Sequence, residues 1–386
     1  EYLGGKKKRT RKRNTRKYGS KSKSKPKSKR TQKNKSGGGI CVSKQCNADK
    51  TVRSDGDIRA ADITVRSDED IRAADITVRS DEDIRAADIT VRSDNDIRAA
   101  VTLWCSNRAE AENKYGHISQ WNTSAVTNMS NLFRDCTEFN DDISQWNVGN
   151  VTDMHGMFDS ARAFNQPLDE WNVANVTNMG FMFYRAKDFN QPIGGWNVGN
   201  VRNMEYMFAG ATAFNRPIGD WDVGNVTTMR GMFHSADAFN QPIGQWNVGN
   251  VRNMHAMFWM VEAFNQPIGK WNVGNVTTMK SMFQGARAFN QPIGEWNVGN
   301  VTNMEAMFQG TSAFNQPLEQ WNVGNVTNMS YMFYGASAFN QPLEQWNVGN
   351  VTNMSYMFYG ASAFNQPLEQ WNVGNVTNMS YMFYGA

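Results

Sequence analysis

The chain has 386 residues and a formal net charge of +4, from 40 Lys and Arg residues against 36 Asp and Glu residues. No run of about 18 apolar residues occurs, so the sequence predicts no membrane span. The chain starts at Glu1 without a methionine and ends inside a repeat at Ala386. We therefore expect a fragment of a longer protein, and the lack of a signal peptide decides nothing about secretion.

Residues 1–40 are predicted to be a disordered basic tail that ends in a run of linker glycines. Between Lys6 and Lys35 there are 17 Lys and Arg residues, and Glu1 is the only acid of the tail. The other residues hold 23 basic and 35 acidic side chains, a net charge of −12. A charge run nearly free of apolar residues stays solvated. Residues 6–35 would bind nucleic acid or an anionic surface by counterion release, act as a nuclear-localisation-like patch, or dock on the acidic remainder.

Residues 41–93 combine a cysteine-containing segment with acidic 13-residue repeats, such as TVRSDEDIRAADI, which begin at residue 51 and whose fourth, shorter copy runs on to residue 100. The sequence does not decide which secondary structure these residues adopt. Cys41, Cys46, Cys105 and Cys136 are not spaced as a zinc site requires, although they allow one or two disulfides. The repeated Ser-Asp-Glu-Asp lacks the glycine and the distal glutamate of an EF-hand calcium loop. We therefore predict no metal ion and no other cofactor.

Residues 94–120 are predicted to form an N-terminal capping helix. The sequence Ser-Asp-Asn-Asp at 93–96 is similar to a helix-capping start. Ile97, Val101 and Trp104 then fall on one helical face. This apolar face would cover the open end of the repeats that follow.

Residues 121–386 repeat a single unit, marked by a tryptophan at every twenty-fifth position from Trp121 to Trp371. Such a period is typical of a solenoid, because one unit cannot bury its own apolar face and must stack on its neighbours. Since the invariant residues recur in every full unit, we expect them to form the core. In the copy at 189–213 this framework comprises Phe189, Asn190, Trp196, Val201, Met204, Met207 and Phe208.

Each coil is predicted to hold short extended segments and one short helix. Within residues 204–211 the apolar side chains recur at i, i+3, i+4 and i+7, which is one face of a helix of about two turns. Gly210 suits its C-terminus. Short extended segments are expected at 193–198 and 201–204. The predicted fold class is therefore a repeat solenoid.

Asparagines recur at turn-like positions of the unit, as at Asn190, Asn197 and Asn200. An inward amide would form a ladder of hydrogen bonds to the coils on either side. Asn150 and Asn175 instead begin Asn-x-Thr sequences that are glycosylation acceptors in a secreted eukaryotic protein. Amides that face inward cannot carry sugar, so the two interpretations exclude each other.

The pattern Val-Thr-Asn-Met-x-x-Met-Phe-x-x-Ala-x-x-Phe-Asn-Gln-Pro-Leu/Ile-x-x-Trp-Asn-Val resembles the repeat of BspA-like surface proteins. These are leucine-rich-repeat relatives whose domain was first described in Mycoplasma lipoproteins and is also common in algae and large viruses. The resemblance covers residues 94–386. It implies a leucine-rich-repeat-like solenoid and surface display, adhesion or protein binding, and it carries no catalytic residue to transfer.

The residues that change between coils are the candidate binding surface. They fall in three columns, directly before the tryptophan, directly after the first methionine, and directly after the phenylalanine. Neutral drift at solvated positions is the alternative, although an off-period tryptophan in the third column would suit an exposed aromatic anchor. The candidates are Glu170, Asp220 and Lys270 in the first column, Glu205, Arg230, His255 and Lys280 in the second, and Tyr184 and Trp259 in the third.

No paired acids, Ser/His/Asp set or phosphate-binding glycine loop rises above chance, so we predict that the protein is not an enzyme. We expect a surface-displayed binding or adhesion protein, at the cell surface or extracellular, with an unidentified protein or glycan ligand. The alternative is a structural or nucleic-acid-associated protein, such as a viral component, in a virion or inside a cell. The tail of 17 basic residues motivates that alternative.

Overall fold

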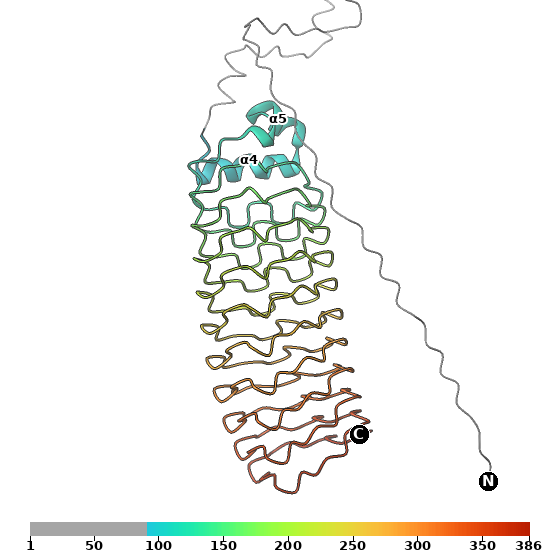
Figure 1. Cartoon of the computed structure of the whole chain (residues 1–386). Helices are drawn as coiled ribbons and strands as arrows, with labels where there is room; N and C mark the ends of the chain where they lie inside the picture. The colour runs from blue at the N-terminus through green and yellow to red at the C-terminus, as the bar shows by residue number, and fades with distance from the viewer. Residues whose placement is uncertain (1–90) are drawn as a thin grey trace, which may run out of the picture. The chain divides into compact units, whose positions relative to one another are not determined.

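A computed structural model describes residues 91–386, which lie within one compact unit, Thr77–Ala386. In this range the named elements are helix α4 (Asp94–Ser106), helix α5 (Arg108–Tyr115) and the 3-10 turn η1 (Ile118–Gln120). After them, the repeated coils lie one upon another, from cyan to red in Figure 1. Our predictions for the tail at 1–40 and for the 13-residue repeats before residue 91 lie outside the described residues.

Backbone hydrogen bonds between coils hold successive units together. In the coil that begins at Trp196, the N–H groups of Tyr206 and Phe208 donate to carbonyl groups of the next coil at 2.7 and 2.9 Å. The N–H group of Met207, which lies between them, closes a turn onto the carbonyl of Met204 at 3.3 Å. Alternate N–H groups thus point along the stack and the others stay within the coil. Parallel bridges recur at the same position of successive coils, from Asn128↔Asp153 to Asn353↔Asn378.

The short helix predicted at 204–211 is wrong. These residues form consecutive turns, with φ of 50° at Tyr206 and 71° at Gly210. An α-helix needs each N–H to bond four residues back, whereas here alternate N–H groups bond the neighbouring coil. Met204, Met207 and Phe208 are nevertheless fully buried. The apolar spacing therefore identified the buried side chains but not the backbone conformation.

The extended segments expected at 193–198 and 201–204 form no named strand in the described residues 91–386, although Asn203 in the second makes isolated parallel bridges to both neighbouring coils. A turn interrupts the first segment, where the N–H of Trp196 bonds the carbonyl of Ile193 at 3.1 Å. A further turn separates the two segments, because the N–H of Val201 bonds Val198 at 2.9 Å. Frequent turns let each short unit close a coil without a continuous strand.

Three columns of aromatic rings fill the core. Trp196 lies parallel to Trp221 of the next coil, with ring centroids 6.5 Å apart. Phe208 stacks on Phe214 at 4.1 Å, and each packs on its equivalents in neighbouring coils. The indole N–H of Trp196 donates to the carbonyl of Leu168, which lies 28 residues earlier in the chain, at 2.9 Å. Burial of one such ring stabilises by about 1.5–3 kcal/mol, and its hydrogen bond avoids the cost of an unpaired buried donor.

Most framework residues predicted from the repeat lie in this core. Phe189, Val201, Met204, Met207 and Phe208 have no exposed surface, and Trp196 is 4% exposed.

The framework asparagines are only partly buried or exposed, and they act by hydrogen bonding. Asn190 Oδ1 accepts the N–H of Asn215 in the next coil at 3.1 Å, and Asn200 Nδ2 donates to the carbonyl of Ala174 in the coil before at 2.8 Å. Asn197 differs, because its Oδ1 accepts the N–H of a glycine two residues on and closes a turn within the coil.

Two helices and a 3-10 turn cover the first coil, where we predicted one capping helix at 94–120. The break falls at Asn107, whose backbone leaves the helical region at φ −150° and whose side chain caps α5 by accepting the N–H of Glu110 at 3.3 Å. At the start of α4, Ser93 Oγ accepts the N–H of Asp96 at 3.2 Å. The buried residues of α4 are Ile97, Ala100, Val101 and Trp104.

Helix α4 also satisfies backbone groups of the first coil that face it. In a later coil, the N–H of Thr152 donates to the carbonyl of Thr127 in the coil before, at 2.9 Å. The N–H of Thr127 donates instead to Asp94 Oδ1 at 2.8 Å, and the N–H of Asn128 donates to the same oxygen at 3.0 Å. Unpaired edge groups invite association with other chains. Asp94 therefore takes the place of a preceding coil.

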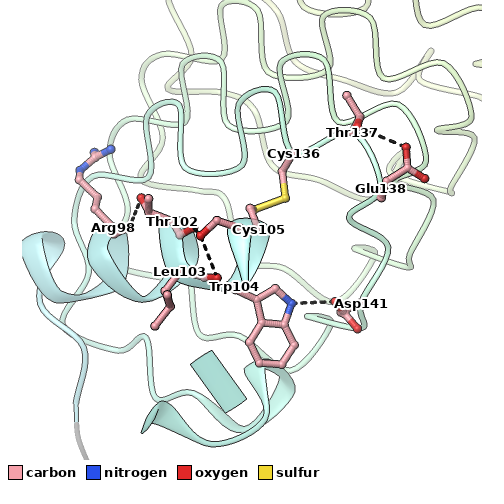
Figure 2. The surroundings of a disulfide bond; sticks show 10 residues. Arg98, Thr102, Leu103, Trp104, Cys105, Cys136, Thr137, Glu138 and Asp141 are labelled. Atoms are coloured by element: carbon pink, nitrogen blue, oxygen red, sulfur yellow. Dashed lines mark hydrogen bonds between the residues drawn. A yellow bond between two sulfur atoms is a disulfide. The ribbon is translucent and has the colours of Figure 1, made fainter. Parts of the chain in front are cut away.

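A disulfide between Cys105 and Cys136 joins α4 to the first coil (Figure 2). Beside it, the indole N–H of Trp104 donates to Asp141 Oδ2 at 2.8 Å, and Arg108 pairs with Asp141 at 2.7 Å. The cap is thus held by one covalent link and by partly buried polar contacts.

Replacing Trp246 by phenylalanine tests the indole hydrogen bond. The substitution keeps an aromatic ring but leaves the carbonyl of Ile218, now 3.0 Å from the indole nitrogen, without its partner. We expect a loss of about 1–3 kcal/mol, seen as a lower urea midpoint and faster amide exchange in the adjoining coils. The exposed neighbour Gln245, changed to alanine, is the control. Equal midpoints for the two variants would show that the bond contributes nothing.

Replacing Cys105 and Cys136 by serine tests the covalent link. The bond closes a loop with a sequence separation of 31, for which the chain-entropy estimate is about 3–4 kcal/mol. We expect faster hydrogen exchange in α4 and in the first coil, while coils near Trp321 keep their protection because each coil contacts only its neighbours. Unchanged exchange in α4 would contradict the assigned role.

Candidate binding surfaces

One face of the stack carries residues that differ from coil to coil. Counting the tryptophan as position 1, these residues stand at positions 10, 11 and 14, beside the turns that bond successive coils. The larger side chains at these positions are partly buried, in contrast to the fully buried methionines and phenylalanine between them. We call the following set the variable face: His155, Phe181, Tyr184, Glu205, Tyr206, Arg230, His234, His255, Trp259, Lys280 and Glu305.

A row of titratable side chains runs along position 10 in five successive coils, in the order Glu205, Arg230, His255, Lys280 and Glu305. Arg230 pairs with Glu205 at 3.2 Å, and Lys280 pairs with Glu305 at 2.9 Å. The acids thus stand at the two ends of the row, and the cations Arg230 and Lys280 stand on either side of His255 at its centre. Exposed ion pairs add little to stability, so this row has more bearing on recognition than on folding.

Aromatic rings lie beside this row. Tyr206 contacts Phe181 with ring centroids 5.1 Å apart, and the Arg230 guanidinium lies 5.4 Å from the centroid of Tyr206. Trp259 stacks on His234 at 4.4 Å with an interplanar angle of 10°. Tyr184 touches Phe181 and Tyr206 in the same cluster. The face therefore combines aromatic and cationic groups that pack on one another.

Position 11 is a column that the sequence analysis missed. Its residues all have positive φ, with 58° at Phe181 and 50° at Tyr206. This conformation costs a non-glycine residue roughly 1–2 kcal/mol, yet five of the eleven coils place an aromatic ring there. The rings Tyr331 and Tyr356 stack at 4.8 Å. The position varies as much as its neighbours do, and that variation is the signal that would have revealed it.

Two histidines of the variable face have lowered pKa values. Burial is the main cause of the lowered pKa of His234, and the positive charge of Arg185 acts in the same direction. Burial also lowers the pKa of His255, with Arg230 and Lys280 in the same direction and Glu305 opposing them. Both imidazoles are therefore neutral at neutral pH.

A second surface is a groove of about 810 Å³ that crosses the coils from Gly219 to Gln320. Prolines at position 22, glycines at position 24 and variable residues at position 25 line it. The glycines allow a close approach of successive coils, because a Cβ at Gly219 would lie 2.5 Å from the carbonyl oxygen of Pro242. The glycines of the Ile-Gly pairs in four successive coils, from Gly219 to Gly294, line the groove, and Glu319 occupies the same position in the coil after them.

The nine candidate residues divide between these surfaces. Asp220 and Lys270 line the groove. Glu170 occupies the same position of an earlier coil, where it is exposed and outside the groove lining. The six candidates of the other two columns lie on the variable face: Tyr184, Glu205, Arg230, His255, Trp259 and Lys280.

Within residues 91–386, no group of three or more His, Cys, Asp and Glu side chains is arranged to hold a metal ion. No helix of the same residues has both the length and the apolar character that crossing a bilayer requires.

Replacing His234 and His255 by glutamine tests the lowered pKa values. Both pKa values lie below the unfolded value of about 6.5, so the unfolded chain takes up protons first as the pH falls. The folded state then loses stability below about pH 6.5 and is unaffected above it. We expect the urea midpoint to fall less between pH 7.5 and 5.5 in the double variant than in the original chain. Equal falls would exclude these histidines as the source.

No curated protein matches the chain. The family model described as "Mycoplasma protein of unknown function, DUF285" matches it three times in tandem, over residues 105–221, 190–296 and 288–386. Together the matches cover all the coils and the end of α4, which is more than half of the sequence. The chain therefore belongs to this repeat family.

Proposed function

We propose that the protein is a non-catalytic binding or adhesion protein, displayed on a surface, that holds its ligand with the variable face. The observation that carries the proposal is the clustering of differences between coils. At positions 10, 11 and 14 the residues that change lie together, whereas the framework between them is the same in coil after coil and is buried. Positions 17 and 25 also vary, but what distinguishes this face is that its aromatic and cationic side chains contact one another.

The chemistry of the face favours recognition of a protein or a glycan. Tyrosine, tryptophan and arginine are the residues enriched at the centres of interfaces, and Tyr184, Tyr206, Arg230 and Trp259 lie on this face. Tyr206 already contacts Tyr184 and Arg230, and Trp259 stacks on His234. Less side-chain freedom is then lost on binding, which favours affinity.

The disulfide supports display outside the cell. Disulfides persist in oxidising environments and are rare in the reducing cytosol. The Cys105–Cys136 bond joins α4 to the first coil, so a stable cap favours an extracellular or cell-surface location.

We further propose that the coils form a leucine-rich-repeat-like solenoid of the BspA-like type. The spacing of the tryptophans falls in the range of repeat lengths of that class. The parallel bridges between equivalent positions of successive coils are consistent with it.

The runner-up is a structural or nucleic-acid-associated protein, such as a virion component. The 17 Lys and Arg residues between Lys6 and Lys35 motivate it, because such a run binds polyanions through counterion release.

Protease shaving of intact producing cells or particles, followed with an antibody against the repeat, separates the two. We expect the repeat to be cleaved from outside. Survival of the repeat until lysis would exclude surface adhesion for this chain and would make the basic tail the leading candidate.

The second arm of the experiment compares attachment of surfaces coated with matched variants of the full chain. Tyr184→Ala with Trp259→Ala removes two rings of the variable face, and we expect at least a roughly tenfold loss of attachment. Glu170→Ala with Asp220→Ala removes two exposed candidates that lie off that face and should leave attachment unchanged. The opposite ranking would move the binding surface to position 25.

A further inference from the structure

Two arginines stand out at position 7 of the coils. In nine coils this position is threonine, and in the coils that begin at Trp196 and Trp246 it is Arg202 and Arg252. Thr227 occupies the coil between them. All three side chains are exposed.

The backbone places the two arginines in register. The N–H of Thr227 donates to the carbonyl of Arg202, and the N–H of Arg252 donates to the carbonyl of Thr227, each at 2.9 Å. Two hydrogen-bonded steps of about 4.8 Å separate the arginine backbones by roughly 10 Å. Thr227 is short, and its hydroxyl donates to the Arg202 carbonyl at 3.1 Å, so it leaves the space between the guanidiniums open.

A notch of about 300 Å³ occupies this place, lined by Arg202, Asn225, Thr227, Asn250, Arg252 and Asn275. The lining contains two cations and no acid. Each asparagine uses one amide hydrogen in the ladder, as Asn250 does with the carbonyl of Gly224 at 2.7 Å. An amide carries two such hydrogens, so a second donor remains on each.

Neither guanidinium is neutralised by an acid in the part of the chain that the structure describes. Within residues 91–386, Arg202 and Arg252 form no ion pair and no side-chain hydrogen bond. The nearest acid along the chain from Thr227 is Asp222, which accepts the N–H of Gly224 at 3.0 Å and is not part of the lining. By contrast, Arg230 on the variable face is paired with Glu205.

We propose that Arg202 and Arg252 form a binding site for a tetrahedral oxyanion, a sulfate or phosphate monoester group, seated over Thr227. A guanidinium offers a planar fork of donors that fits two oxygens of such an anion. Two guanidinium groups that approach from opposite sides can each donate hydrogen bonds to oxygens of the same tetrahedral anion. The spare amide hydrogens add neutral donors, and the absence of a lining carboxylate removes the competing anion.

The site is independent of the variable face, because none of its lining residues stands at position 10, 11 or 14. The range of ligands that the two arginines suit is also narrower than the range that the variable face suits. Two cations two coils apart suit a single dianionic or monoanionic ester better than a long polyanion, which would need a continued row of charge. The coils on either side have the neutral residues Thr177 and Thr277 at this position.

Arginine-directed footprinting of the full chain tests the proposal. Phenylglyoxal modification is followed by peptide mass spectrometry, which separates these two arginines from the basic tail. The competitors are inorganic sulfate, inorganic phosphate, galactose 6-sulfate and glucose 6-phosphate, against chloride at equal ionic strength. We expect a bound oxyanion to slow modification of Arg202 and Arg252 roughly fivefold or more. The exposed Arg162 and Arg287 should react at an unchanged rate in the same samples.

Two variants decide whether the arginines act together. Arg202→Thr installs the residue of nine other coils and should abolish the protection of Arg252. Arg162→Ser removes an equal charge at position 17, where later coils carry Ser337 and Ser362, and should leave that protection intact. Equal slowing of all exposed arginines, no slowing, or continued protection of Arg252 in Arg202→Thr would overturn the site.

The two esters identify the source of the group. Protection at a lower concentration of galactose 6-sulfate than of glucose 6-phosphate would assign the site to a sulfate ester, and the reverse order would assign it to a phosphate ester.

Discussion

Hydrogen bonds that run from one coil to the next are the constraint on which the rest of the described structure depends. Alternate N–H groups of each coil, such as those of Tyr206 and Phe208, are committed to the next coil. Each bond contributes only about 0.5–1.5 kcal/mol, but they recur in every coil and all require the same register. An inserted residue would shift every later bond of its coil, which accounts for tryptophans that keep one spacing from Trp121 to Trp371.

The same constraint separates positions that are bound to the core from positions that are free. Side chains such as Met204 and Phe208 point inward and have no exposed surface, so any change there leaves a cavity or a clash in three coils at once. Positions 10, 11 and 14 bond the neighbouring coil through their backbone groups, so their side chains can change without loss of those bonds. The proposed binding function uses that freedom, and the proposed oxyanion site uses it at position 7.

A stack of this kind has a problem at its first coil, where no earlier coil supplies partners. In helix α4, the carboxylate of Asp94 supplies the missing acceptor and accepts the N–H groups of Thr127 and Asn128. The disulfide of Cys105 and Cys136 then keeps the helix in place. The cap therefore depends on long-range contacts that a repeat pattern does not contain, whereas its capping start at 93–96 and the spacing of its apolar residues could be identified from the sequence.

The sequence by itself determined the period, the buried set and the existence of a cap, because apolar residues recur wherever burial recurs. It placed Trp196, Met204 and Phe208 inside correctly, and it identified two of the three columns that meet on the variable face. Only the tertiary structure decided the backbone of the coil, since the spacing i, i+3, i+4, i+7 fits a helix and also fits turns with positive φ at Tyr206 and Gly210. The turns are selected because alternate N–H groups find their carbonyl acceptors in the next coil, almost a full repeat away in the sequence. A local sequence pattern cannot indicate such a distant acceptor.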